Sequence, residues 1–187
     1  ANASPAEQAY IRALAPRYGA NPTANRAQRD TAYARAMQAL SRNNPNDLDA
    51  AALYAEAMMD LRPWNYWQKD GKPYPGTADF VATLERVLRT RPNHPGACHF
   101  YIHAVEAVQP EKAVACAERL ASLMPGAGHL VHMPAHIYIR VGRWNDAIEA
   151  NKHAVHADQT YIADQKPNGV YPLAYYPHNH HFLAFAA

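Results

Sequence analysis

The chain has 187 residues, of which 49% are hydrophobic and 18% charged, and its net charge is +2 with the histidines neutral. This composition is that of a folded globular protein and excludes a chain that is disordered throughout. No run of Lys and Arg exceeds two residues, and no apolar run is long enough to cross a bilayer, so we expect neither nucleic acid nor a membrane as a partner. Frequent alanine and sparse β-branched residues favour helices.

Helix signals follow one another from the N-terminus onward. Ser4 and Glu7 have the spacing of a capping box, with a proline at the first helical position between them. Thr23 is predicted to cap the second helix, Asp47 to begin the third, and Thr77 to cap the fourth. By apolar spacing and turn residues, the predicted helices cover approximately residues 5–16, 23–43, 46–61, 77–88, 96–108, 111–123, 129–141, 144–158 and 178 onward.

Two stretches interrupt these helices. An irregular insert at residues 62–76 carries Trp64, Tyr66 and Trp67 together with three prolines. We expect its aromatic rings to pack over a helix end, and the alternative is a platform for a ligand. Residues 164–177 are rich in proline and tyrosine and are predicted to form a loop.

The two cysteines, Cys98 and Cys116, fall in the two helices of one predicted hairpin. They lie at unequal distances from its turn near Gln109, which argues against a disulfide between them. We expect buried free thiols.

The helices recur at a regular interval along the chain. Pro92 and Pro125 each close a helix, and Ala113 and Ala147 open equivalent helices at almost the same separation. Paired helices with a period of about 34 residues resemble the tetratricopeptide repeat, whose turn between paired helices is similar to residues 142–148. The resemblance covers most of residues 30–160. It implies an all-α fold, an α–α solenoid of antiparallel hairpins, with residues 1–187 as one segment and a concave groove lined by first helices.

Residues 99–106 and 128–136 also resemble segments of uncharacterised bacterial tetratricopeptide-repeat proteins. That likeness implies the fold and leaves the reaction open. The chain begins at Ala1 without an initiator Met, and residues 182–185 read as the start of an apolar helix. We therefore expect a processed or partial chain from a longer solenoid, exported from a bacterial cell with its signal peptide removed.

The histidines recur with the repeat. His99 and His103 lie four positions apart on one predicted helix, and His132 and His136 lie four apart on the first helix of the next repeat. Each member of the second pair follows its counterpart at the same interval that separates the two closing prolines. Positions four apart share a helix face, and equivalent positions of adjacent repeats stack side by side. Both pairs are therefore expected on one surface, facing the groove.

Such a cluster suits a transition-metal ion, since imidazoles from two packed helices can converge on one ion. The candidate ligands are His99, His103, His132 and His136. Glu106, on the same face, is a candidate ligand or general base. His129 and His178 are further candidates, either as ligands or as outer partners of the ligands. Zinc is the first choice, and copper the second because the set is rich in histidine and free of thiolate.

The remaining polar residues are assigned more simply. Asp49 and Glu56 fall on the equivalent face of the helix before the insert, so the groove is expected to run from carboxylates to histidines. His153 and His156, on a second helix, are expected to be surface or packing residues, and His94 is expected in a loop. Pro134 falls inside the helix of the second histidine pair, where it either kinks the helix or marks a later helix start.

Three functions remain open at this point, and with them the question whether the protein is an enzyme. The first is a metalloprotein with an open site, in its fullest form a metal-dependent enzyme of unknown catalytic residues and substrate. The second is a scaffold that binds a peptide or protein in the groove. The third is self-assembly through the open ends of the solenoid. No nucleophile motif or glycine-rich phosphate loop is present, so phosphoryl and acyl transfer by familiar routes are not expected.

Overall fold

A computed structural model describes residues 2–19 and 25–187 of the chain. The described residues are helical, and the β-structure among them is one isolated bridge between Trp67 and Pro73. The predicted all-α fold of antiparallel helical hairpins is confirmed. The chain divides into two compact units, Ala1–Thr90 and Arg91–Ala187. We describe each unit by itself, and a single stacked segment over residues 1–187 stays a prediction.

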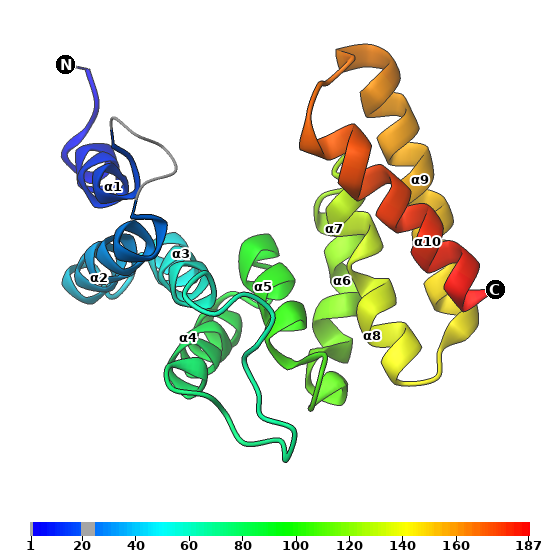
Figure 1. The fold of residues 1–187 in the computed structure, drawn as a ribbon, viewed down its shortest axis with the longest axis horizontal. Coiled ribbons are helices and arrows are strands. Elements are labelled where there is room, and N and C mark those ends of the chain that lie inside the picture. Colours follow the sequence, from blue (N-terminus) through cyan, green and yellow to red (C-terminus); the bar gives the residue numbers. More distant parts are fainter. Residues whose placement is uncertain (1, 20–24) are drawn as a thin grey trace. The chain divides into compact units, whose positions relative to one another are not determined.

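The first unit contains the helices drawn from blue to green in Figure 1. Their bounds are α1 Pro5–Leu14, a 3₁₀ turn Ala15–Arg17, α2 Arg26–Asn43, α3 Leu48–Met59 and α4 Thr77–Thr90. The predicted capping box of α1 is present: Ser4 Oγ accepts from the Glu7 N–H, and Glu7 Oε2 accepts from the Ser4 N–H. Asp47 caps α3 by accepting from the Ala50 N–H at 3.0 Å, as predicted. Thr23 lies outside the described residues.

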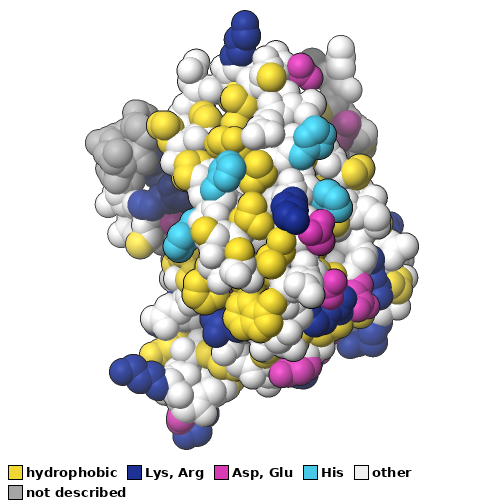
Figure 2. Space-filling model, turned by 90° about the vertical axis from the view of Figure 1, so that its right-hand side faces the viewer, with side chains coloured by type: hydrophobic (Ala, Val, Ile, Leu, Met, Phe, Trp, Pro, Cys, Tyr) yellow, Lys and Arg dark blue, Asp and Glu magenta, His cyan; other side chains and the backbone are white. Residues whose placement is uncertain are grey.

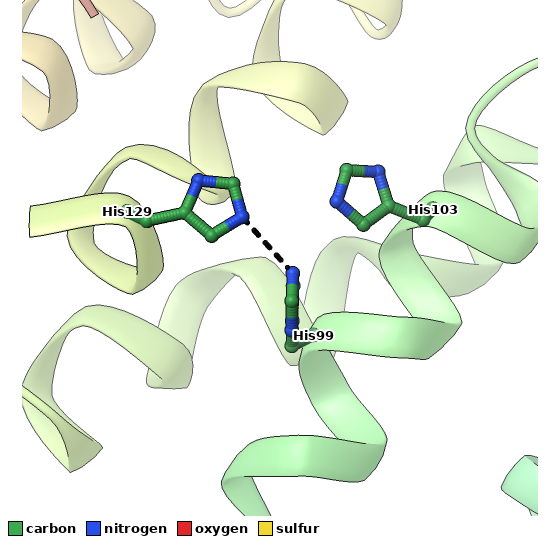
Figure 3. A group of neighbouring side chains, drawn as sticks. All are labelled: His99, His103 and His129. Atoms are coloured by element: carbon green, nitrogen blue, oxygen red, sulfur yellow. Dashed lines mark hydrogen bonds between the residues drawn. The ribbon is translucent and has the colours of Figure 1, made fainter. Parts of the chain in front are cut away.

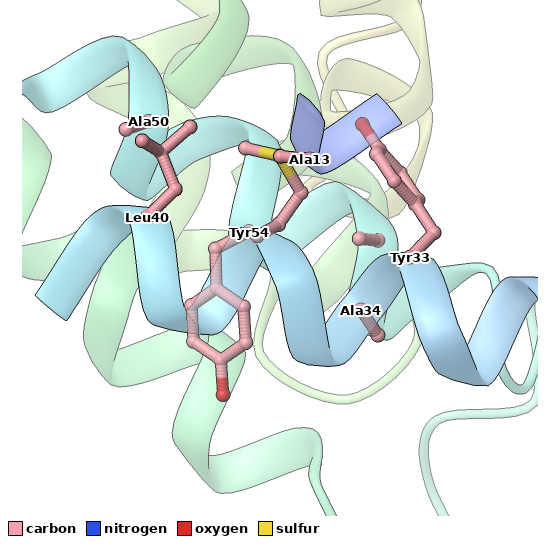
Figure 4. Packing of buried hydrophobic residues seen from close by; sticks show 8 residues of the cluster. Ala13, Tyr33, Ala34, Leu40, Ala50 and Tyr54 are labelled. Atoms are coloured by element: carbon pink, nitrogen blue, oxygen red, sulfur yellow. The ribbon is translucent and has the colours of Figure 1, made fainter. Parts of the chain in front are cut away.

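The core of this unit lies between α1, α2 and α3. Tyr33, Met37 and Leu40 of α2 pack against Tyr54 of α3, with Ala13 of α1 beside them (Figure 4). Several alanines of α3 are fully buried, and their small side chains let the neighbouring helices approach closely.

The aromatic insert is anchored at one point. Tyr66 is buried and its ring meets that of Phe80 in α4 edge to face, with 5.2 Å between centroids. Trp64 is 78% exposed, so the predicted packing holds for Tyr66 and is wrong for Trp64. The sequence predicts a side-chain cap at Thr77, but the Thr77 hydroxyl donates to the Tyr66 carbonyl at 2.7 Å. That hydroxyl therefore holds the insert, and the predicted side-chain cap of α4 is wrong.

The second unit contains two hairpins and the start of a third. Helix α5 pairs with α6, the split helix α7–α8 pairs with α9, and α10 packs back on α9. The bounds are α5 Pro95–Val105, a 3₁₀ turn Pro110–Ala113, α6 Val114–Leu123, α7 Gly128–His132, α8 Pro134–Arg140, α9 Trp144–Gln165, a π-helical turn Tyr171–Tyr175 and α10 Tyr176–Ala186. Cys98 and Cys116 are buried free thiols, as predicted.

The loop predicted at residues 164–177 is wrong at both ends. Helix α9 runs to Gln165, and helical structure resumes at Tyr171. Pro172 and Pro177 each lie in the first turn of a helical segment, where the missing N–H costs no hydrogen bond. They start helices here and do not mark a loop.

The face of the second unit formed by α9 and α10 exposes hydrophobic side chains with scattered histidines among them (Figure 2). Trp144 and Phe185 are 45% and 64% exposed, and their ring centroids lie 6.2 Å apart. His153 and His156 are exposed on α9, as predicted. None of the described helices combines the length and apolar character needed to span a membrane.

Candidate metal site

Helix α5 carries the first histidine pair on the side opposite its core face. Cys98 and Ile102 are fully buried toward the rest of the hairpin, while His99 and His103 share the other face with ring centroids 5.0 Å apart. The start of this helix is set by His94, whose Nδ1 accepts from the Ala97 N–H at 3.2 Å. His94 lies in the segment before α5, as predicted, and is the buried N-cap of that helix.

The second pair lies across a helix break. Pro134 cannot donate a backbone hydrogen bond, and it begins α8 directly after α7. Met133 between them keeps right-handed helical dihedrals, φ −50° and ψ −36°, so the chain continues in nearly the same direction. His132 and His136 therefore still share a face, with ring centroids 4.8 Å apart.

The first histidine triad consists of His99, His103 and His129. The Nε2 atoms of His99 and His129 lie 3.1 Å apart (Figure 3). The ring of His103 lies 5.0 Å from that of His99 and 6.1 Å from that of His129. One nitrogen from each of the three side chains lies within 4.8 Å of the others, and Figure 3 shows the rings turned toward a common point.

The second histidine triad consists of His132, His136 and His178. The Nε2 atoms of His132 and His178 lie 3.1 Å apart, and the ring of His136 lies 4.8 Å and 5.8 Å from theirs. One nitrogen from each again lies within 4.8 Å of the others. The ring of Phe182 contacts all three imidazoles at 4.6–4.7 Å between centroids and forms an apolar wall.

The grouping differs from the sequence expectation. The two registered pairs do not form one four-histidine group; each pair is completed by a histidine near the start of the next first helix. His129 is the second residue of α7, and His178 is the third residue of α10. The sequence predicts these two as further ligands or outer partners, and their Nε2 atoms make the two 3.1 Å contacts between imidazoles. Counting equivalent positions cannot reveal this shift, because it depends on how neighbouring helices are placed along their axes.

Glu106 connects the two triads. Its Oε2 lies 2.6 Å from Nδ1 of His136, and its Oε1 lies 3.4 Å from Nδ1 of His103. The three side chains are only 12–16% exposed. Burial by itself would raise the pKa of Glu106, but the hydrogen bonds from His103 and His136 outweigh it and lower the pKa to about 2. An ionised carboxylate accepts, so both Nδ1 atoms carry the proton.

Asn151 accepts a hydrogen bond from His132 and orients that ring, as Glu106 does for His136. It is not among the site residues predicted from the sequence. The Asn151 amide is fully buried, its Nδ2 donates to the Ala147 carbonyl at 2.7 Å, and its Oδ1 lies 2.7 Å from Nδ1 of His132. The amide is thereby oriented, and His132 must donate from Nδ1. One signal was available: Asn151 interrupts the small buried residues Ala147 and Ala154 on one face of α9.

For four histidines of the two triads, burial favours the neutral form. Burial and, after it, the neighbouring imidazoles lower the pKa of His99 to about 2 and that of His129 to about 4. The same two causes lower the pKa of His132 and of His178. A neutral imidazole is the form that binds metal ions, because its lone pair is free.

One histidine of α10, His180, stands outside the triads. His180 is exposed and rests against Tyr176, with ring centroids 4.7 Å apart. Asp49 and Glu56 belong to the first unit, so the expected run from carboxylates to histidines stays a prediction. Burial, followed by the charge of Asp60, raises the pKa of Glu56 to about 7.

Fold and site together define an all-α helical-repeat protein whose second unit holds two histidine triads. No family model matches the chain, and no curated protein matches it either. Solved structures of MamA are similar in fold, with the same tetratricopeptide-like solenoid. "MamA RS-1 ArsTM double mutant" has a TM-score of 0.61 at 17% identity, over 100% of this chain and 85% of that one. MamA from Desulfovibrio magneticus RS-1, residues 41 to the end, has a TM-score of 0.57 at 14% identity, over 100% and 95%. At these identities the likeness concerns the fold alone.

Proposed function

We propose that this helical-repeat protein binds a transition-metal ion through Nε2 of His132, His136 and His178. The observation that carries the proposal is that two of these rings form hydrogen bonds through Nδ1, the nitrogen on the side away from the triad. Nδ1 of His136 donates to Glu106 and Nδ1 of His132 donates to Asn151, so both Nε2 lone pairs face the triad. Metal-binding histidines are commonly oriented in this way by a carboxylate or another acceptor. Nε2 of His136 is buried and has no hydrogen-bond partner among the described residues, which is costly unless something binds it.

The distances support the same reading. Two nitrogens bound at about 2.0–2.1 Å to one zinc ion lie about 2.9–3.4 Å apart, depending on the angle at the metal. The Nε2 atoms of His132 and His178 are 3.1 Å apart. The 2.6 Å between Glu106 and His136 is shorter than that range, so this contact is a hydrogen bond, and Glu106 supports the site from outside.

Three histidine ligands leave a coordination position for water or a substrate, as in catalytic zinc sites. Zinc is the first candidate and copper the second, since a thiolate-free imidazole set suits both. A bound ion would acidify a water at the open position, and this is what a metal-dependent enzyme would use. Both oxygens of Glu106 already accept hydrogen bonds from histidines, so we assign it to orientation and no longer to the role of general base.

The test uses two histidines of α10 that differ in one respect. His178 belongs to the triad, while His180, two positions later, is exposed and outside it. Chelated and reloaded wild-type protein should retain zinc after desalting. His178→Ala should lose one equivalent of zinc relative to wild type, and His180→Ala should lose none, with helix content unchanged in both by circular dichroism. Reloaded wild-type protein that holds no zinc would overturn the proposal.

A protein-interaction scaffold is the second candidate. It is favoured by the exposed hydrophobic side chains of α9 and α10, and by a hollow of about 540 Å³ between α6, α7 and α9 lined in part by Val131, His153 and Tyr161. Helical repeats present extended surfaces of this kind. The partner to test first is a second copy of the chain: sizing as a function of concentration should show association that Phe185→Asp weakens. A concentration-independent monomer would exclude self-assembly.

A further inference from the structure

We infer that His99, His103 and His129 hold a second metal ion, so that the two triads form one dinuclear centre with Glu106 between them. The inference rests on the proposed function, because it extends the site at the second triad to a neighbouring ion. The two triads have the same construction. Each consists of a pair four positions apart on one first helix and a histidine from the start of the next, and each contains one Nε2–Nε2 distance of 3.1 Å.

The first triad presents free lone pairs by the same logic as the second. The Nδ1–H of His103 points to Oε1 of Glu106, which leaves Nε2 of His103 as an acceptor. The side chains of His99 and His129 are partly buried, and their Nε2 atoms lie 3.1 Å apart. Without an ion, His99 and His129 can share one hydrogen bond, and the ring of His103 takes no part in it. A bound ion would contact all three rings.

The two triads are in direct contact. The ring centroids of His103 and His136 lie 5.3 Å apart, and those of His129 and His132 lie 6.1 Å apart. One carboxylate orients a histidine of each triad, so a change at Glu106 reaches both. Metal ions in two-metal sites lie about 3.5–4 Å apart and act on one bound molecule from two sides. The contact between the triads therefore suits two ions that share a ligand.

The charge balance indicates what that ligand is. Six neutral imidazoles and one carboxylate would surround two divalent ions, because Glu106 is the carboxylate that contacts these histidines within the second unit. The centre would then carry a net positive charge in a partly buried place, which is costly without an anion. We therefore assign to the open positions a small anion with oxygen donors, such as hydroxide or a carboxylate, bridging the two ions. Phe182 and Tyr175, whose rings lie against the triads, leave an apolar surrounding for it.

Stoichiometry separates this inference from the proposed function. Titration of metal-free wild-type protein with Zn²⁺ against a chromophoric chelator should give two equivalents. The double variant His99→Ala, His129→Ala should still bind one equivalent of Zn²⁺, at the second triad. His178→Ala should still bind one equivalent, at the first triad. His153→Ala with His156→Ala, which removes two exposed histidines, should still give two. A different result is a single equivalent of Zn²⁺ in the wild type that is lost in His178→Ala and kept in the double variant. That result would overturn the second ion and leave the proposed function standing. None at all would overturn both.

A second measurement does not depend on variants that must fold. Wild-type protein loaded with two equivalents of Cu²⁺ should show an electron paramagnetic resonance signal broadened or diminished by coupling between neighbouring ions. At one equivalent or less, the signal should be that of isolated Cu²⁺ with nitrogen ligands. Two full, uncoupled signals at double loading would place the ions far apart and overturn the dinuclear centre. Addition of azide, a small anion, should change the spectrum of the doubly loaded protein, and an unchanged spectrum would overturn the bridging anion.

Discussion

His132 donates from Nδ1 to Oδ1 of Asn151 over 2.7 Å, and both side chains are fully buried. The asparagine comes from α9, the second helix of the same repeat, where it stands among small core residues. The candidate metal site is thus connected to the packing of the hairpin. A change in the core of α9 should be felt as a change in metal affinity.

Asn151→Ala tests this connection. Without the amide oxygen, Nδ1 of His132 loses its partner and the ring is no longer held with Nε2 toward the triad. Zinc affinity at the second triad should fall about 10–100-fold. The free energy of unfolding of the metal-free protein should fall by about 1–3 kcal/mol, because a buried donor is left unsatisfied. Chelator competition and urea unfolding measure the two effects. Asn145→Ala, at the exposed start of α9, is the control, and equal zinc affinities in the two variants would count against the role of Asn151.

Glu106→Gln should disturb the orientation of one of its two histidine partners, His103 or His136. The amide keeps one acceptor and gains a donor, so one of the two histidines must change its tautomer or lose its bond. We expect zinc affinity to fall about 10–100-fold at the triad that loses its orientation, with helix content retained. Zinc competition measured on Glu106→Gln and on the exposed-site control Glu111→Gln provides the comparison. A loss confined to Glu111→Gln, or none in either, would contradict the role of Glu106.

The metal-free protein should lose stability in acid. Folding lowers the pKa of His129 to about 4 and that of His99 to about 2, whereas an unfolded histidine titrates near about 6.5. Below about 6.5 the unfolded chain therefore binds protons that the folded chain excludes, and stability falls as the pH falls. The loss continues to about pH 4 for His129 and to about pH 2 for His99. Above about 6.5 both states are neutral and this contribution is constant.

Urea unfolding at pH 7.5, 6.0 and 5.0 measures that slope, which is about 1.4 kcal/mol per pH unit for each such histidine well below pH 6.5. His129→Leu should make the slope shallower, and removal of the exposed His153 should leave it unchanged. Equal slopes in wild type and His129→Leu would show that His129 is not buried in the neutral form.

Gly128→Ala should destabilise the second unit. A Cβ on Gly128 would overlap the carboxylate of Asp158 and lie 3.1 Å from the Ala154 carbonyl. Asp158 is fully buried and accepts from Tyr171 at 2.6 Å and from Asn179 at 2.7 Å, so it cannot move without breaking these bonds. We expect a loss of about 1–3 kcal/mol in the free energy of unfolding.

Gly126→Ala is the matched control for Gly128→Ala. Gly126 lies two positions earlier, in the turn before α7, and a Cβ on it would meet no atom of the described residues within 4 Å. The melting temperatures of the two variants should therefore differ, with that of Gly126→Ala close to wild type. Similar losses in both would show that the turn itself, and not the contact with Asp158, sets the effect.

Chelation should leave the fold intact. Structural zinc sites contribute about 10–16 kcal/mol of apparent binding free energy, so small domains built on them unfold without metal. Here Ile102, Leu120 and Ile137 are fully buried and supply apolar core packing in addition to the histidines. The chelated protein should keep its helix content by circular dichroism and show a modestly lower melting temperature. Loss of the helices on chelation would make the metal a structural one.

Much of this protein could be predicted from local patterns in the chain. The capping box at Ser4, the cap at Asp47 and the pairing of successive helices into hairpins depend on neighbours close in sequence, and the structure has them. The face of the histidine pairs follows likewise from helical spacing. Pro172 and Pro177 show the limit of such local rules. A proline can follow the end of a helix or lie in its first turn, and these two lie in first turns.

Tertiary structure decided which histidines meet. His129 and His178 reach His99 and His132 because neighbouring helices are offset along their axes, and that offset is set by packing of whole faces. Asn151 became a partner of His132 because α9 lies against α7. The pKa of His99 and that of His129 are lowered by burial among the other imidazoles, a property that no single helix possesses. By itself the sequence determined the helices and the residue types of the site; packing between helices decided the two triads, their tautomers and their charge.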